Sequence, residues 1–201
     1  MKTVCSVLIL TITAFAADAA TVVVNWSVSS NPSALLLDSN SNPLSAGSAA
    51  TGDGTLVQLG YYDQAIITNQ FRGNWVVLAS TTMGDDGLEV SGRFSTTTIL
   101  GGTPFPEPSA GTALAIRFYD GTSVATSTYF NAVGNTSGGW NFVTPSDPAP
   151  VMNIVIDKVS GIKFQSGDVF KTQIAIPEPS SLLLASLALS FSVLTRRRQR
   201  N

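Results

Sequence analysis

The 201-residue chain has no histidine and a single cysteine, and only 12% of its residues are charged. Without histidine it has no base for a Ser-His-Asp triad and no imidazole ligand for a metal ion. The lone cysteine, Cys5, excludes a disulfide framework. The 11 basic and 13 acidic residues give a net charge of -2, which excludes the strongly basic surface typical of nucleic-acid-binding proteins.

Apolar residues make up 44% of the chain, and many of them lie at its two ends. At the N-terminus, Lys2 precedes an uncharged run at 4–16, and small residues up to Ala19 follow at a spacing that signal peptidase accepts. The run gives about 20 Å of helix, which is short for a hydrocarbon core about 30 Å thick. We therefore predict a signal peptide at 1–19, whose removal takes the cysteine with it; the alternative is an uncleaved N-terminal anchor.

The last 25 residues contain three parts in a fixed order. A Pro-Glu-Pro segment comes first, an uncharged run at 180–195 follows, and a basic tail ends the chain. The residues of the two flanking parts are Pro177, Glu178, Pro179, Arg196, Arg197, Arg198 and Arg200. The run gives about 24 Å of helix, a short membrane span that the arginines and local thinning of the bilayer accommodate. Because basic residues stay on the cytoplasmic side, we predict that the tail lies inside and the rest of the chain outside.

This order resembles the PEP-CTERM sorting signal of Gram-negative bacteria that make extracellular polysaccharide. The resemblance implies that the Pro-Glu-Pro segment is recognised by an exosortase, a membrane enzyme, that 180–195 is a transient anchor, and that the arginines form a retention tail. A second Pro-Glu-Pro segment at 106–108 is followed by Arg117 and Asp120, so no membrane span follows it. The middle segments LVQLGYYDQA, GNWVVLAS, LAIRFYDGTS and TSTYFNAV are also similar to PEP-CTERM anchored proteins of Verrucomicrobia-like genomes, which implies no activity.

Between the two ends, residues 20–176 are expected to form one domain, long enough to bury its own core. Its six basic and eleven acidic residues give a charge near -5, which disfavours nucleic acid and bare anionic lipid as partners. Apolar and polar residues alternate at 22–28, 88–94, 114–118 and 170–176, and further strands are expected at 56–61, 75–79, 126–133, 153–156 and 161–164. A short helix is possible at 63–70.

The predicted fold class is therefore all-β, with a single β-sandwich of jelly-roll or immunoglobulin-like type between the signal peptide at 1–19 and a transmembrane sorting helix within 177–201. Segments 31–51 and 101–111 are rich in Ser, Asn, Pro and Gly and are expected to be surface loops, and 144–150 to be a rigid connector.

Carboxylates are the candidates for catalysis or metal binding. Those available to a two-carboxylate glycosidase are Asp53, Asp85, Asp86, Glu89, Glu107 and Asp168. Asp85 and Asp86 are also weak calcium candidates, but their spacing does not match an EF-hand, and Gly-Asp-Asp-Gly suits a hairpin turn. We therefore expect no enzyme activity, no metal and no cofactor.

Aromatic residues are the candidates for stacking on sugar rings. Trp26 and Trp75 lie within apolar strands and are expected in the core. Trp140 follows two glycines and is the candidate for an exposed glycan contact.

These patterns favour an exported, exosortase-processed surface or exopolysaccharide-matrix protein without catalytic activity. Its expected location is first the inner membrane, with the domain outside the cytoplasm, and then the cell surface or matrix. The expected partners are an exosortase-type membrane enzyme, the membrane itself through the C-terminal helix, and extracellular polysaccharide. A carbohydrate-binding module at the cell surface is the alternative function, and a glycoside hydrolase is the third.

Overall fold

The computed structural model describes residues 20–47, 51, 53–65, 71–84, 90–101, 108–159, 161–167 and 169–175. The predicted signal peptide and sorting segment lie outside these ranges. So do the candidate residues Asp85, Asp86, Glu89, Glu107, Asp168, Pro177, Glu178, Pro179, Arg196, Arg197, Arg198 and Arg200. Within the described ranges, no helix is both long and apolar enough to cross a membrane.

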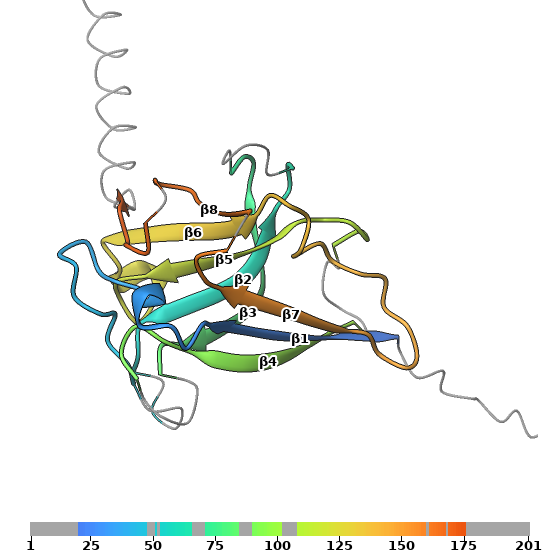
Figure 1. Ribbon diagram of the computed structural model, residues 1–201, viewed down its shortest axis with the longest axis horizontal. Helices are drawn as coiled ribbons and strands as arrows, with labels where there is room; N and C mark the ends of the chain where they lie inside the picture. The colour runs from blue at the N-terminus through green and yellow to red at the C-terminus, as the bar shows by residue number, and fades with distance from the viewer. Residues whose placement is uncertain are drawn as a thin grey trace, which may run out of the picture.

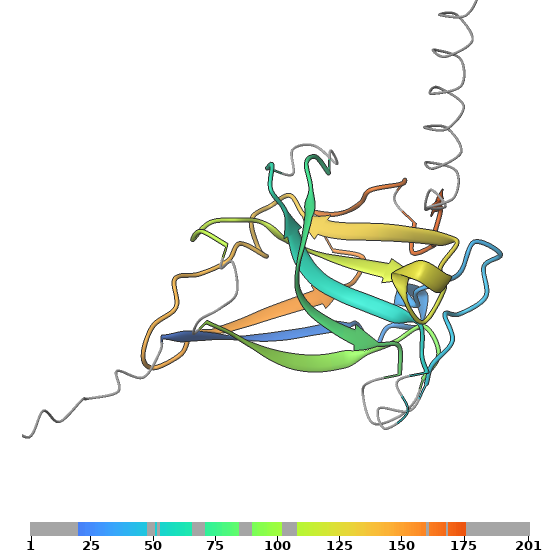
Figure 2. The same ribbon diagram turned by 180° about the vertical axis from the view of Figure 1, so that it is seen from behind.

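The described residues form two β-sheets, one above the other in Figures 1 and 2. In the smaller sheet, the central strand β1 (Thr21–Val28) is antiparallel to β4 (Ser95–Gly101) and parallel to β7 (Val151–Ile156). The larger sheet is antiparallel. Its strands, in spatial order, are β3 (Trp75–Thr82), β2 (Leu56–Tyr62), β5 (Leu114–Tyr119), β6 (Tyr129–Asn135) and β8 (Ile162–Phe164), and β9 (Ile174–Ala175) also pairs with β6. Two short 3-10 helices, η1 (Pro32–Ala34) and η2 (Val124–Thr126), lie in the connections.

One hydrophobic core joins the two sheets. Every second residue of β1 is buried, which confirms the alternation predicted at 22–28. The fully buried side chains come from both sheets and include Trp26, Leu59, Leu114, Ile116, Phe118, Ile154 and Ile156. The Trp26 indole donates a hydrogen bond to the Thr98 hydroxyl at 3.0 Å, so its one polar atom is satisfied within the core. The all-β prediction with two packed sheets is therefore confirmed; the jelly-roll or immunoglobulin-like type remains a prediction.

The prediction of a strand at 88–94 is wrong over the part of this segment that the structure describes. Residues 90–94 form a turn and an irregular segment, and the strand β4 begins at Ser95. Phe94 is nevertheless buried, and its ring meets that of Trp26 edge-on at a centroid distance of 5.2 Å. The Thr-rich sequence of β4 lacks the apolar alternation of a half-buried strand, so its pairing with β1 is not visible from the sequence.

The segment at 31–51 is not a pure surface loop. Leu36 and Leu44 are buried in the main core, and the Leu44 N–H donates to the Leu36 carbonyl at 3.0 Å. The bounds of two further strands also differ from those predicted: β6 begins at Tyr129, and β9 covers only Ile174–Ala175. The possible helix at 63–70 is absent from 63–65, and its remainder lies outside the described residues.

Candidate functional site

Trp140 does not lie on the surface, so the expectation of an exposed glycan contact there is wrong. It is only 4% exposed and belongs to the main core. The Leu114 N–H donates to the Trp140 carbonyl at 2.9 Å, and the Phe142 N–H donates to the Thr112 carbonyl at 2.8 Å. This short extended pairing turns alternate side chains inward, so Trp140 and Phe142 both enter the core.

The other two tryptophans divide between core and surface. Trp26 is buried, as predicted. The expectation that Trp75 lies in the core is wrong: it is half-buried on the outer face of the larger sheet, against Tyr62 and Phe71. The pairing of β2 with β3 shifts its register between Leu59 and Gly60, and this irregularity sets which face Trp75 occupies.

Gly60 makes room for the Trp75 ring. A Cβ atom at Gly60 would lie 2.2 Å from the Val76 carbonyl oxygen and 2.7 Å from the nearest atom of the Trp75 ring. A side chain at this position is therefore incompatible with the observed approach of β3.

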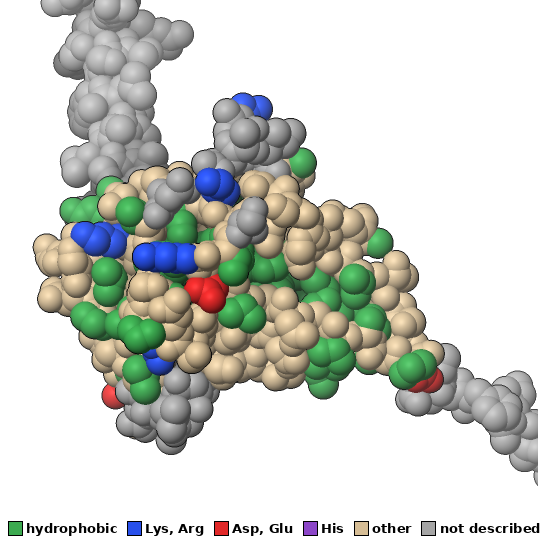
Figure 3. Space-filling view, viewed as in Figure 1, with side chains coloured by type: hydrophobic (Ala, Val, Ile, Leu, Met, Phe, Trp, Pro, Cys, Tyr) green, Lys and Arg blue, Asp and Glu red, His purple; other side chains and the backbone are tan. Residues whose placement is uncertain are grey.

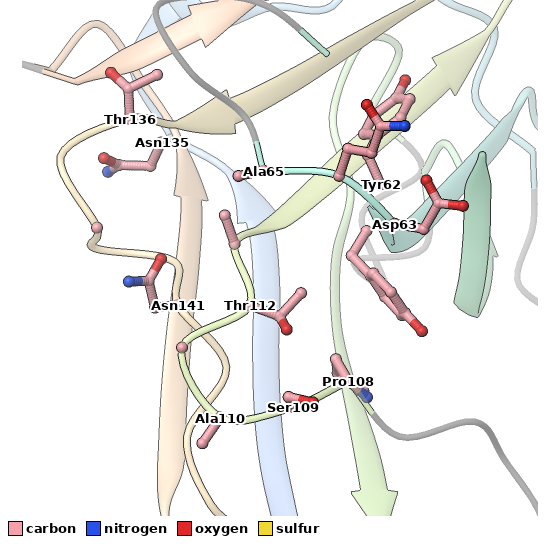
Figure 4. A pocket seen from close by; sticks show the side chains of 15 residues that line it. Tyr62, Asp63, Ala65, Pro108, Ser109, Ala110, Thr112, Asn135, Thr136 and Asn141 are labelled. Atoms are coloured by element: carbon pink, nitrogen blue, oxygen red, sulfur yellow. The ribbon is translucent and has the colours of Figure 1, made fainter. Parts of the chain in front are cut away.

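A cavity of about 650 Å³ opens at the end of the larger sheet, where β2 and β6 end and β5 begins (Figure 4). Its described walls are three chain segments: 61–65, 108–113, and a loop that contributes Asn135, Thr136, Gly138 and Asn141. In Figure 4, Asn135 and Thr136 lie across the cavity from Tyr62 and Asp63, with Thr112 between them. All three segments directly continue strands of one sheet, so the sheet fixes the spacing of the walls.

The lining of the cavity is polar and almost uncharged. Asp63 is the single ionisable acid or base among its lining residues apart from the tyrosines. Its carboxylate accepts hydrogen bonds from the backbone N–H and the side-chain amide of Asn74, at 2.8 and 2.9 Å. The Ser109, Thr112 and Asn141 side chains form no hydrogen bond within the described part of the chain. Amides and hydroxyls beside a tyrosine ring suit a neutral ligand rich in hydroxyl groups.

A second group of side chains surrounds Arg117 on the outer face of the larger sheet. The guanidinium carbon lies 4.7 Å from the ring centres of both Trp75 and Phe130, and 5.2 Å from that of Tyr62. Trp75, Phe130 and Arg117 are each half-buried. Cation–π contacts of this kind connect β5, which carries Arg117, to β2, β3 and β6 across the outer face of the sheet.

Hydrogen bonds extend this group of side chains in two directions. The Tyr62 hydroxyl donates to the Gln165 side-chain carbonyl at 2.8 Å. The Tyr119 hydroxyl and the Trp75 indole both donate to the Gln58 side-chain carbonyl, at 2.9 and 3.2 Å. These hydrogen bonds connect the side chains into one network, in which each of the polar groups named has a partner within the protein.

The pKa values of the two tyrosines in the network are shifted in the same direction. Burial raises the pKa of Tyr62, against the opposing charge and hydrogen bond of Arg117. Burial likewise raises the pKa of Tyr119, again with Arg117 acting in the opposite direction. Both hydroxyls therefore remain neutral hydrogen-bond donors over a wider pH range than an exposed tyrosine.

The described residues hold no group of three or more His, Cys, Asp or Glu side chains able to bind a metal ion. Of the six carboxylates considered for a glycosidase, the structure describes only Asp53. The calcium and glycosidase candidates thus stay predictions.

The folded part of the chain reaches the sorting segment without a spacer. Ile174 and Ala175 form β9, and they pair with Phe130 and Tyr129 of β6. Residues 175–199 match the family model of the PEP-CTERM protein-sorting motif. No curated protein and no solved structure matches the chain. The motif indicates a secreted protein that is targeted to an exosortase, a membrane enzyme, as the order of the three C-terminal parts predicts.

Sequence reasoning missed the network around Arg117. The alternation at 114–118 does place Arg117 on the polar face of its strand, opposite Ile116. Its aromatic partners lie on β2, β3 and β6, far from it along the chain, and only the strand order brings them together.

Proposed function

We propose that the protein is exported, held in the inner membrane with its β domain outside the cytoplasm, processed by an exosortase-type enzyme, and then retained at the cell surface or in the exopolysaccharide matrix. It has no catalytic activity in this proposal. The observation that carries it is the position of the PEP-CTERM motif, which begins at residue 175, where the last strand of the domain ends. The similarity to proteins of Verrucomicrobia-like genomes is consistent with it and stays a prediction.

The composition of the motif has a physical reason. Because Pro177 and Pro179 have φ fixed near -65° and lack a backbone N–H donor, we expect this segment to stay separate from β9 and from a following helix. A segment that stays extended is accessible to an enzyme active site. Glu178 adds one negative charge between the two prolines.

The chain contains its own matched control for a test of this function. Replacing Pro177, Glu178 and Pro179 by alanine removes the motif, and replacing 106–108, the other Pro-Glu-Pro segment, changes the same residue types elsewhere. We expect the first variant to accumulate unprocessed in the membrane fraction, and the second to be processed and to leave the membrane fraction as the parent chain does. Equal processing of both variants, or of the parent chain in cells without an exosortase, would contradict the proposal.

Carbohydrate binding is the second candidate function, and the cavity at the end of the larger sheet is the observation that favours it. Its walls offer Ser109, Thr112 and Asn141, groups that pair with sugar hydroxyls, and the ring of Tyr61. The test is affinity electrophoresis of the full chain in gels that contain polysaccharide from the producing cells. Asn141→Ala should abolish the retardation, whereas Asn153→Ala, at another exposed asparagine on the other sheet, should leave it unchanged. Retardation that is absent, or equal in both variants, would contradict binding in this cavity.

A further inference from the structure

The pairing of β9 fixes how far the domain stands from the membrane. Ala175 is held against Tyr129, and the uncharged run of the sorting segment begins at Ser180. Five residues span at most about 18 Å when fully extended. The headgroup layer on each side of a bilayer takes up about 5–8 Å of that distance. While the sorting segment is anchored, as the proposed function requires, the edge of the larger sheet at β9 therefore lies close to the lipid headgroups.

Three lysines lie along this edge. Lys163 is in β8, which pairs with the same strand, β6, as β9 does. Lys158 is exposed, and its Nζ atom lies 6.0 Å from the centre of the Phe170 ring. Lys171 is the residue after Phe170 and four residues before Ala175. Figure 3 shows Lys and Arg side chains gathered over β6 and β8, with an acidic group among them.

The charges of the domain are distributed unevenly. Residues 150–175 contain the three lysines and two aspartates, which gives +1, whereas residues 20–149 contain three arginines and nine acids, which gives -6. The overall charge near -5 therefore disfavours anionic lipid as a partner for the domain as a whole, but the three lysines lie within a stretch of net positive charge, in which Asp157 directly precedes Lys158. An anionic surface attracts the edge and repels the remainder, which orients the domain.

Two residues beside the lysines, Val159 and Asp38, change the polarity and the charge of this edge. Val159 follows Lys158 and is 53% exposed, so the turn between β7 and β8 presents an apolar side chain beside a charge. Burial by itself would raise the pKa of Asp38, but hydrogen bonds from Asn42 and Asn40 and the charge of Lys171 lower it below its ordinary value. Asp38 therefore stays ionised near Lys171 and offsets part of its charge, and the Lys171 ammonium also donates a hydrogen bond to the Ser41 hydroxyl. Lys158 is therefore the principal lysine to test, and Lys163 is tested together with it.

We propose that the edge formed by Lys158, Val159, Lys163 and Lys171 docks on the anionic phospholipid headgroups of the membrane that holds the sorting segment. The lysines pair with lipid phosphates, and the exposed valine reaches the boundary between headgroups and acyl chains. Because the anchor keeps the domain at a high local concentration near the membrane, a weak attraction is sufficient for docking. Each lysine near the surface increases the docked population about fivefold. Docking presents the β domain in one orientation while the enzyme acts on the segment after β9.

The test uses the full chain reconstituted in vesicles, with Cys5→Ser and a fluorophore on a single introduced cysteine. The label sits either at Val159→Cys, on the proposed edge, or at Ile99→Cys, a 66% exposed position on the other sheet. Vesicles contain phosphatidylcholine alone or with phosphatidylglycerol, and a nitroxide on the lipid headgroup quenches nearby fluorophores. We expect several-fold stronger quenching at position 159 than at 99 in phosphatidylglycerol vesicles, and a smaller difference in phosphatidylcholine.

Charge variants make the test specific. Lys158→Gln with Lys163→Gln should reduce the quenching at position 159 to its value in phosphatidylcholine, whereas Arg72→Gln with Arg93→Gln removes the same charge elsewhere and should not. Circular dichroism confirms that each variant is folded. Equal quenching at the two labels, or quenching unaffected by the lysine variant, would overturn the docking alone. A chain that fails to float with the vesicles would overturn the proposed anchoring and the docking with it.

Discussion

The guanidinium group of Arg117 donates hydrogen bonds from both Nε and Nη2 to one oxygen, the hydroxyl of Tyr62, at 3.1 and 3.0 Å. The two residues lie on adjacent strands, β5 and β2, and the rings of Trp75 and Phe130 extend the contact to β3 and β6. A single side chain of β5 thus contacts residues from three other strands of the larger sheet.

Replacing Arg117 by lysine should lower the free energy of unfolding by about 1–3 kcal/mol, because an ammonium group keeps the charge but loses the planar fork and its stacking on the rings. Urea unfolding of the parent and the variant measures the difference. Arg72→Lys, at an exposed position, is the control and should change the stability by less than about 0.5 kcal/mol. Equal effects at the two positions would show that the network contributes nothing.

The buried tyrosines predict a loss of stability in alkali. The pKa values of Tyr62 and Tyr119 are raised in the folded state, so the unfolded chain ionises first. The contribution of the two tyrosines to the free energy of unfolding is fully present below the unfolded-state pKa of about 10. It is lost as the pH rises through the pKa values of the folded state. Urea unfolding measured across this pH range should show the decline, and Tyr119→Phe should make it shallower. A decline of the same steepness in this variant would contradict the assignment.

Ile154 should be among the most sensitive positions of the smaller sheet. Its side chain is fully buried between the sheets, so Ile154→Ala leaves a cavity and should lower the free energy of unfolding by about 2–5 kcal/mol. Val151, in the same strand, is 59% exposed, and Val151→Ala should change it by less than about 0.5 kcal/mol. Chemical denaturation measures both, and a small effect at Ile154 would mean that the sheets do not share one core.

Gly60→Ala should disturb the outer face of the larger sheet. The added methyl group meets the Val76 carbonyl and the Trp75 ring, so we expect a loss of about 1–3 kcal/mol and an altered near-ultraviolet circular dichroism signal. At Gly139 the added atom would meet only the flexible side-chain amide of Asn135, at 3.0 Å or more. Gly139→Ala is therefore the control, and an identical spectrum for Gly60→Ala would contradict the close approach.

The candidate site was only partly accessible to sequence reasoning. The tripeptide at 177–179, the apolar run and the arginines are contiguous, so their order can be recognised without a structure, and the match at 175–199 agrees with it. The role assigned to Trp140 failed because it rested on the two glycines before it. The hydrogen bonds between 112–114 and 140–142 turn that ring inward, and they join segments that lie apart in the sequence.

The amino-acid sequence by itself determined the all-β class and the sorting motif, because a period of two and a run of apolar residues before arginines are properties of neighbouring residues. Tertiary structure alone decided that β1 pairs with β4 and β7, that Arg117 meets Tyr62, and that β9 closes the domain directly before the motif. These contacts depend on which strands become neighbours. That choice is made by the burial of one shared core, to which distant parts of the chain contribute together.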